Sequence, residues 1–290
     1  MEFMKLEAGQ VAVVTGAANG IGRAVAEALY ARGIRVVLAD IDGDALAKTA
    51  AEIGSDTVAL PTDVADPAQL KQLADRTLEH FGRVDLVFNN AGMGVGGPIW
   101  EVEPEDWHRV WSVSVQGVVN GMHAFVPHLI AAGRGHIVNT ASLAGVTVGV
   151  FNAPYTASKH AVISLTEALH GELAILSPEI GATVVCPGPV DTQMLRGLTE
   201  SVAPLLGDND SLPTQPAEGW LATLTPDQWQ CLAPGLGAVS HLAAEAIPPS
   251  AAADMILAAI EANRLYVTTH PSWSPQATMR VARIVADFQA

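Results

Sequence analysis

Short apolar runs alternate with longer amphipathic stretches along most of the chain. Strands are predicted over Val11–Thr15, Arg35–Ala39, Thr57–Pro61, Asp85–Phe88 and Ala182–Cys186. Helices are predicted over Arg23–Arg32, Asp44–Glu52, Pro67–Phe81, Asp106–Ala132 and Pro154–Leu176. Strands that alternate with helices of about 10–15 residues are typical of a parallel sheet with helices on both faces. The pattern therefore predicts an α/β fold with a doubly wound parallel sheet.

The pattern changes after the strand that ends at Cys186. Residues 189–250 contain many prolines and glycines, together with Met194, Leu195, Trp220 and Trp229. Because such sheets bind ligands at the carboxyl ends of their strands, we expect this insert to be a substrate-binding lobe within a single domain of residues 1–290. Its apolar side chains favour a bulky apolar or aromatic substrate, although a packing subdomain that never touches substrate fits the same pattern. We expect residues 207–211 to form a mobile tip. Toward the C-terminus, a helix is predicted over residues 251–262, a strand over 265–269 and a closing helix over 280–288.

The charge of the chain narrows the function classes. With 15 basic and 30 acidic residues among 290, the net charge is −15, and no basic patch suited to nucleic acid is evident. No apolar run of about 18 residues is present, and the N-terminus, where Met1-Glu2-Phe3 resembles a cloning junction, lacks a signal-peptide pattern. Cys186 and Cys231 match no metal-ligand spacing. We therefore expect a cytoplasmic protein that uses no metal, nucleic acid or membrane.

A glycine-rich turn follows the first predicted strand. Gly16, Asn19, Gly20, Ile21 and Gly22 stand between a strand and a helix, which is the context of a dinucleotide-binding motif. The glycines allow a tight turn and a close approach of the backbone, so that N–H groups at the helix start can face a pyrophosphate. A purely structural glycine turn is the alternative.

Asp40 ends the second predicted strand. A carboxylate roughly 20 positions beyond the glycine turn can accept hydrogen bonds from both hydroxyls of an adenosine ribose, and it repels a 2′-phosphate. The position favours NAD(H) over NADP(H), and Asp42 adds to the repulsion, whereas Arg23 and Arg35 leave NADP(H) open. Alternatively, Asp40 only caps the next helix.

Polar and small residues follow two further strands. Asp63, which precedes Val64, can bond an adenine amino group, or it belongs to a loop in which Asp66-Pro67 starts a helix. Asn89-Asn90-Ala91-Gly92 follows the strand that ends at Phe88. Small residues at this place let a cofactor ring lie against the backbone, and asparagine side chains can lock the turn.

Tyr155 and Lys159 form the candidate catalytic pair. They are four positions apart in the first turns of a predicted helix, so their side chains share one face. A phenol has a reference pKa of about 10, and an ammonium in a partly dry cleft is expected to lower it toward the range of a general acid/base. Ser142, in the loop after an apolar strand, can hydrogen-bond the same substrate oxygen. The alternative is a surface pair without function.

Together these motifs resemble the short-chain dehydrogenase/reductase family. Thr15-Gly-x-x-x-Gly-x-Gly22, Asp40, Asp63, Asn89-Asn-Ala-Gly92, Ser142, Tyr155-x-x-x-Lys159 and Pro187-Gly188 follow the family's order and spacing. The resemblance implies a Rossmann-like domain with a parallel sheet of about seven strands. It also implies NAD(P)-dependent oxidation of alcohols or reduction of carbonyls without a metal. We therefore expect a short-chain alcohol dehydrogenase or carbonyl reductase that uses NAD(H) to interconvert a secondary alcohol and a ketone.

The resemblance assigns roles to individual residues. Tyr155 would be the acid/base, Ser142 would orient the substrate oxygen, and Lys159 would hold the nicotinamide ribose and lower the pKa of Tyr155. The cofactor-binding residues that it implies are Gly16, Asn19, Gly20, Ile21, Gly22, Asp40, Asp63, Val64, Asn90, Ala91, Gly92, Tyr155, Lys159, Pro187, Gly188, Val190 and Thr192. The expected lining of the substrate pocket is Met93, Ala144, Phe151, Met194 and Leu195.

Ser114 departs from the family pattern, which usually has an asparagine at this position. That asparagine is held to keep a helix distortion open and to bind a water that links Lys159 to solvent. We expect Ser114 to join the catalytic set through an extra water, while a different proton path, a slow enzyme and a packing role stay open. The departure also leaves a second function class, a non-catalytic cofactor-binding protein on the same fold.

The two long predicted helices, Asp106–Ala132 and Pro154–Leu176, are apolar on more than one face. Such helices usually bury a second face against a partner, and the family pairs them across a twofold axis, so we expect a homodimer or homotetramer. Their histidines, which are His123, His128, His160 and His170, are interpreted as interface or surface residues. Near the C-terminus, Tyr266-Val-Thr-Thr-His270-Pro271 stands in place of the family's frequent glycine-rich ending, and His270 is either a turn residue or reaches the cleft.

Overall fold

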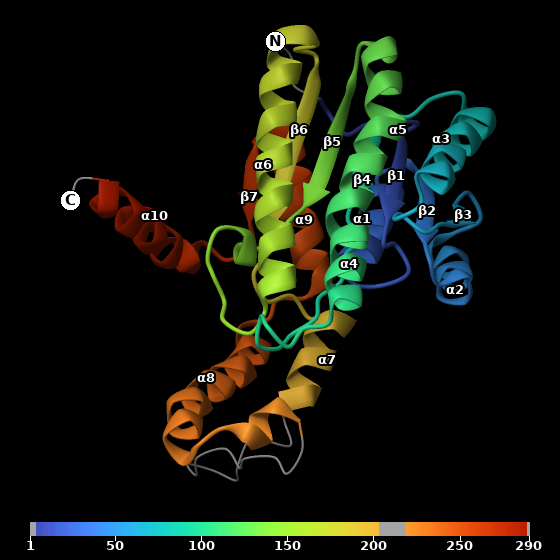
Figure 1. Ribbon diagram of the computed structural model, residues 1–290. Helices are drawn as coiled ribbons and strands as arrows, with labels where there is room; N and C mark the ends of the chain where they lie inside the picture. Colours follow the sequence, from blue (N-terminus) through green and yellow to red (C-terminus); the bar gives the residue numbers. More distant parts are fainter. Residues whose placement is uncertain (1–3, 203–218, 289–290) are drawn as a thin grey trace. The chain divides into compact units, whose positions relative to one another are not determined.

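The computed structural model describes residues 4–202 and 219–288, and its centre is a parallel sheet (Figure 1). Seven strands of these residues form it in the order β3-β2-β1-β4-β5-β6-β7. The strands are β1 Val11–Thr15, β2 Arg35–Asp40, β3 Val58–Pro61, β4 Leu86–Asn89, β5 Gly135–Thr140, β6 Ile180–Cys186 and β7 Tyr266–Thr268. The strand order reverses between β1 and β4, and ligands of such sheets bind at the carboxyl ends beside this point. The predicted Rossmann-like sheet is confirmed.

Helices cover both faces of the sheet. They are α1 Gly20–Tyr30, α2 Gly43–Ile53, α3 Pro67–Phe81, α4 Pro104–Trp111, α5 Gly117–Ala132, α6 Ala153–Leu176 and α9 Pro249–Glu261, whereas α10 Ser274–Phe288 points away from the sheet and buries none of its residues. Ala12 and Val14 of β1 pack into one core with α1 and α9, whereas Val13 packs into a second core with α3, α5 and α6. This alternation follows from the two-residue period of a strand, and Figure 1 shows α1 and α9 behind the sheet. None of the described helices combines the length and apolarity needed to cross a bilayer.

The predicted helix over Asp106–Ala132 is divided in the structure. It consists of α4, a π-helical turn over Ser112–Gln116 and α5. A π turn holds one extra residue per turn without interrupting the run of helical residues, so hydrophobic periodicity alone does not locate it. The turn brings Ser114 to a fully buried position at the inner side of the helix.

The described residues among 189–249 form a compact unit of their own, and the other described residues form a second one. The smaller unit contains α7 Gln193–Val202, a short 3₁₀ turn over Trp220–Thr223 and α8 Pro226–Glu245. Thr225 starts α8 with a capping box, in which its hydroxyl accepts from Gln228 N and the Gln228 side chain accepts from Thr225 N. The expected tip at 207–211 lies outside the described residues.

His136 of β5 gives the first testable prediction. Its Nε2 lies 2.8 Å from Thr183 Oγ1, and because that hydroxyl donates to Arg264 O, Nε2 must carry the hydrogen. The buried Nδ1 then has no hydrogen-bond partner among the described residues, and burial lowers the pKa of His136 to about 3, with a smaller contribution from His170. Since an unfolded histidine titrates near pH ~6.5, the unfolded state binds the extra proton between these values, and folding stability falls as the pH falls.

We expect the free energy of unfolding to lose about 1.4 kcal/mol per pH unit at this residue between roughly pH 6 and pH 4. Urea unfolding at several pH values measures this slope. His136→Gln, which keeps a donor for Thr183, should flatten it, and His123→Gln at an exposed position on α5 should not. An unchanged slope in His136→Gln would mean that another group controls acid stability.

Candidate active site

The side chains of Ser142, Tyr155 and Lys159 come together beyond the carboxyl end of β5. α6 begins at Ala153 with Pro154 in its first turn, so Tyr155 and Lys159 project from the first two turns. Ser142 acts on the Tyr155 phenol by hydrogen bonding, which lowers the pKa of Tyr155. The Lys159 ammonium lies 5.5 Å from the centroid of the Tyr155 ring. An acid/base candidate, a hydroxyl and a cation therefore lie in one cluster.

Lys159 is buried, and a backbone carbonyl orients its ammonium group. Its Nζ donates to Thr140 O over 2.8 Å, and only 3% of the residue is exposed. Burial lowers the pKa of Lys159 to about 8, and the electrostatic effect of Cys186 opposes this only in part. Thr140 was not singled out in the sequence, although a polar residue that ends a buried strand just before Ser142 was a usable signal.

The pKa of Tyr155 shifts in the direction opposite to the one expected from the sequence. Burial of the phenol raises its pKa, and the hydrogen bond with Ser142 lowers it by less. The ammonium of Lys159 gives its hydrogen bond to Thr140 O and lies over the ring rather than against the phenol oxygen. In the protein by itself, therefore, the loss of water around a phenolate outweighs the favourable neighbours.

Ser114 contacts the loop that follows β4. Its Oγ accepts from Met93 N over 3.2 Å and donates to Met93 O over 3.3 Å. Lys159 is close by, because a Cβ built on Gly92 would lie 3.2 Å from Lys159 Nζ and 3.6 Å from Ser114 Oγ. A serine hydroxyl has a single hydrogen, and here Met93 O takes it, so the hydroxyl fixes this loop beside Lys159.

The glycine turn fits a dinucleotide pyrophosphate. Gly16 has φ +64°, and a Cβ on Gly22 would overlap Gly16 O and lie 2.6 Å from Asn90 Nδ2, so the turn closes only with glycine there. Asn19, at the start of α1, makes no side-chain cap hydrogen bond, and the first turn has no acidic residue. α2 and α3, by contrast, are capped by Asp42 and Asp66. The start of α1 is thus a helix terminus suited to an anion.

Asn90 ties the glycine turn to the strand ends. Its Nδ2 donates to Thr15 O over 3.0 Å and to Gly16 O over 3.3 Å, while its Oδ1 accepts from Thr140 Oγ1 over 3.2 Å. Thr15 Oγ1 in turn accepts from Asn90 N over 2.9 Å. The expected locking of this turn by an asparagine side chain is present, and it connects β1, β4 and β5.

Asp40 lies beside the glycine turn and does not cap α2. Its Oδ2 accepts from Ala18 N over 3.0 Å, and its Oδ1 accepts from Asp42 N over 3.1 Å. The cap of α2 is Asp42, whose Oδ1 accepts from Ala45 N over 3.0 Å, so the capping alternative for Asp40 was wrong. Asp63 bonds within its own loop, where its Oδ1 accepts from Ala65 N over 2.9 Å.

The other predicted site residues divide between the two units. Those in the larger unit include Met93 and Ala144, whose N–H groups bond the hydroxyls of Ser114 and Ser142, and Phe151, which has φ +57°. Those in the smaller unit are Val190, Thr192, Met194 and Leu195. There Thr192 Oγ1 accepts from Leu195 N over 3.4 Å at the start of α7. Within residues 4–202 and 219–288, no group of three or more His, Cys, Asp and Glu side chains could hold a metal ion.

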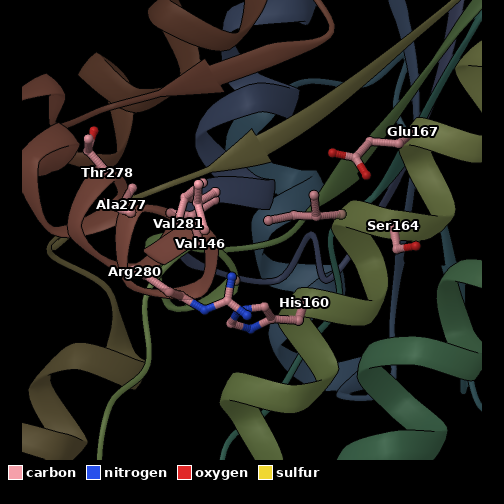
Figure 2. A pocket seen from close by; sticks show the side chains of 12 residues that line it. Val146, His160, Ser164, Glu167, Ala277, Thr278, Arg280 and Val281 are labelled. Atoms are coloured by element: carbon pink, nitrogen blue, oxygen red, sulfur yellow. The ribbon is translucent and has the colours of Figure 1, made fainter. Parts of the chain in front are cut away.

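A separate cavity of about 730 Å³ lies between α6 and α10. Figure 2 shows His160 and Glu167 of α6 directed toward the side of α10, with the His160 ring next to Arg280, and Ser164 of α6 also lines the cavity. None of the predicted site residues lines it. The cavity is therefore distinct from the cluster around Tyr155.

Comparison with known proteins establishes the family. The sequence model described as short chain dehydrogenase matches residues 10–203. This chain therefore belongs to the short-chain dehydrogenase/reductase family of oxidoreductases, whose members bind a nicotinamide cofactor and small-molecule substrates and are typically oligomeric.

Named relatives and solved structures agree with this membership. The chain is 42% identical over 196 residues to 1-deoxy-11-beta-hydroxypentalenate dehydrogenase of Streptomyces exfoliatus, which covers 66% of this chain and 70% of that protein. It is 32% identical over 282 residues to a CLA biosynthesis dehydrogenase/reductase of Lactiplantibacillus plantarum, covering 96% and 94%. A short-chain dehydrogenase/reductase from Burkholderia phymatum, solved in complex with NAD, is 37% identical with a TM-score of 0.81 and coverage of 98% and 97%.

Proposed function

We propose that this protein is an NAD-dependent oxidoreductase that interconverts a secondary alcohol and a ketone, with Tyr155 as the acid/base. The observation that carries the proposal is the cluster of Ser142, Tyr155 and Lys159 beside the carboxyl edge of the sheet. The glycine turn and the carboxylate of Asp40 meet at the same edge through the Ala18 N–H. A relative named as a dehydrogenase of a hydroxy compound supports an alcohol substrate.

The residues present can hold a dinucleotide. The start of α1 behind the glycine turn would bind its pyrophosphate, and Asp40 would accept from the hydroxyls of its adenosine ribose. Asp40 uses two acceptor positions on Ala18 N and Asp42 N, so further lone pairs stay available for those hydroxyls. Its negative charge disfavours a 2′-phosphate, which is the basis for preferring NAD(H) to NADP(H).

The chain's own residues transfer the proton of the substrate oxygen. When bound, the nicotinamide ring supplies the hydride chemistry. Ser142 donates to the substrate oxygen and orients it, and the Tyr155 phenol gives its proton to that oxygen in reduction or takes it in oxidation. Lys159, held by Thr140 O, contributes positive charge next to Tyr155 and so stabilises the phenolate. The apolar side chains in the sequence of residues 189–250 favour a bulky apolar or aromatic substrate.

A fluorescence assay of NADH turnover tests the proposal. Aromatic and aliphatic secondary alcohols and their ketones are offered with NAD(H) and, in parallel, with NADP(H). We expect turnover of at least one bulky substrate, with a higher kcat/KM for NAD(H). Tight NADH binding without turnover over the whole panel would instead support a non-catalytic cofactor-binding protein.

Ser114 is proposed to position the loop next to Lys159 rather than to carry protons. Ser114→Ala leaves the partly buried N–H and C=O of Met93 without this partner, a cost of about 1–3 kcal/mol, so kcat should fall roughly five- to hundredfold. The midpoint of the pH–rate profile should stay in place, and Ser114→Asn should recover much of the rate. The control is Ser112→Ala in the same π turn. A shifted midpoint of the pH–rate profile in Ser114→Ala would support a proton relay through Ser114. An unchanged kcat would mean that Ser114 has only a packing role.

A further inference from the structure

The segment after β7 contacts the Pro187–Gly188 turn of the candidate active site. It reads Thr269-His270-Pro271, and both Thr269 and His270 are buried, with 4% and 8% of each residue exposed. We propose that Thr269 and His270 are positioning residues, which hold the Pro187–Gly188 peptide and through it the loop that carries Ser142. The inference deepens the proposed function, because it names residues that set the geometry of the same site.

The N–H side of the Pro187–Gly188 peptide is held by Thr269. Gly188 N donates to Thr269 Oγ1 over 2.9 Å. The same oxygen lies 2.7 Å from His270 Nδ1, so the imidazole fixes the threonine hydroxyl in turn. His270 N donates to Thr268 Oγ1 over 3.2 Å, which sets the backbone of this short segment.

The C=O group of the same peptide is held by the loop that carries Ser142. Pro187 O accepts from Leu143 N over 2.9 Å and from Ser142 Oγ over 3.5 Å. Both polar groups of one peptide are therefore occupied, one by the segment after β7 and the other by the loop after β5. A shift of this peptide would move the Ser142 loop relative to Tyr155 on α6.

The His270 ring also packs against Gly188. A Cβ built on Gly188 would lie 2.5 Å from His270 Nδ1 and 2.7 Å from His270 Cγ. The ring therefore packs directly on the Cα of this glycine, and the peptide cannot move toward β7. This contact answers the question that the sequence left open for His270: its ring lies behind the Pro187–Gly188 turn as a support.

Thr269→Val tests the inference, because valine keeps the shape of threonine and removes Oγ1. We expect kcat to fall at least about tenfold. The Kd for NADH should rise by a smaller factor, because Pro187 and Gly188 are expected cofactor contacts while the glycine turn and Asp40 are untouched. Thr269→Ser, which restores the hydroxyl, should recover the rate. The matched control is Thr77→Val, a threonine of α3 that is 1% exposed and whose hydroxyl donates to Leu73 O over 2.7 Å. It should leave kcat unchanged.

Amide hydrogen exchange provides a readout that does not need activity. In Thr269→Val the N–H groups of Gly188 and Leu143 should exchange at least about fivefold faster than in Thr77→Val. Unchanged exchange at both amides would overturn the inference, and so would faster exchange with an unchanged kcat. If exchange responds as expected but the wild type turns over nothing in the panel, the support by Thr269 stands and the proposed function fails.

Discussion

Tyr155→Phe is expected to lower kcat by roughly 10²–10⁴-fold, which is the usual contribution of a positioned acid/base. Phenylalanine preserves the ring that packs beside Gly94 and under the Lys159 ammonium, so the loss should come from the hydroxyl alone. NADH binding, followed by fluorescence titration, should change by no more than about twofold, because the glycine turn is untouched. Steady-state kinetics with the best substrate of the panel measures the effect.

A second tyrosine gives a matched control. Tyr266 of β7 is half exposed, and its hydroxyl donates to Glu167 Oε1 over 2.6 Å, which together with partial burial raises the pKa of Tyr266 to about 12. Tyr266→Phe should keep the wild-type kcat. Retained turnover in Tyr155→Phe would remove Tyr155 from the mechanism.

The raised pKa of Tyr155 makes the two reaction directions differ in pH dependence. Reduction of a ketone uses the protonated phenol, which is the form that burial favours. Oxidation of an alcohol needs the phenolate, so its rate should rise with pH through the range in which reduction is flat or falls. Lys159 loses its charge around pH 8 in the protein alone, which would limit oxidation at high pH unless a bound dinucleotide keeps it protonated.

Asp40→Ala is expected to change the ratio of kcat/KM for NAD(H) to that for NADP(H) by about 100-fold in favour of NADP(H), or about 2.7 kcal/mol. The substitution removes acceptors for the ribose hydroxyls and a charge that repels a 2′-phosphate. It also releases Ala18 N–H and Asp42 N–H, which the carboxylate now occupies and which could donate to that phosphate. Kinetics with both cofactors and one substrate measure the ratio.

Asp66→Ala is the control for this change. Asp66 also bonds backbone N–H groups, as the cap of α3, and it lies on a different loop. Its loss should lower stability by roughly 1 kcal/mol without altering the cofactor ratio. An Asp40→Ala enzyme that keeps the wild-type preference would show that other residues select the cofactor.

Local signals in the sequence predicted most of the fold. α3 matches its predicted bounds because Asp66-Pro67 marks its start and Gly82, with φ +70°, marks its end. α1 begins at Gly20, before the predicted Arg23, because the glycines of the turn already belong to its first turn. No helix was predicted within residues 189–250, but α7 and α8 form there in spite of the prolines and glycines.

The contacts that complete the site join residues distant in sequence. Lys159 and Thr140 are 19 positions apart, Ser114 and Met93 are 21 apart, and Thr269 and Gly188 are 81 apart. Motif spacing located Tyr155, Lys159 and Ser142, but it gave no measure of burial. The direction of the Tyr155 pKa shift was therefore wrong, since it depends on how much water surrounds the phenol.

Transfer of deuterium tests the central claim most directly. The protein is incubated with the panel of ketones and with NADH that carries deuterium at both C4 positions. Mass spectrometry then measures the yield and the deuterium content of the alcohol product. The account predicts a wild-type alcohol with deuterium on its carbinol carbon and a comparable yield from Tyr266→Phe, but almost none from Tyr155→Phe. An alcohol without deuterium, or an equal yield from Tyr155→Phe, would contradict it.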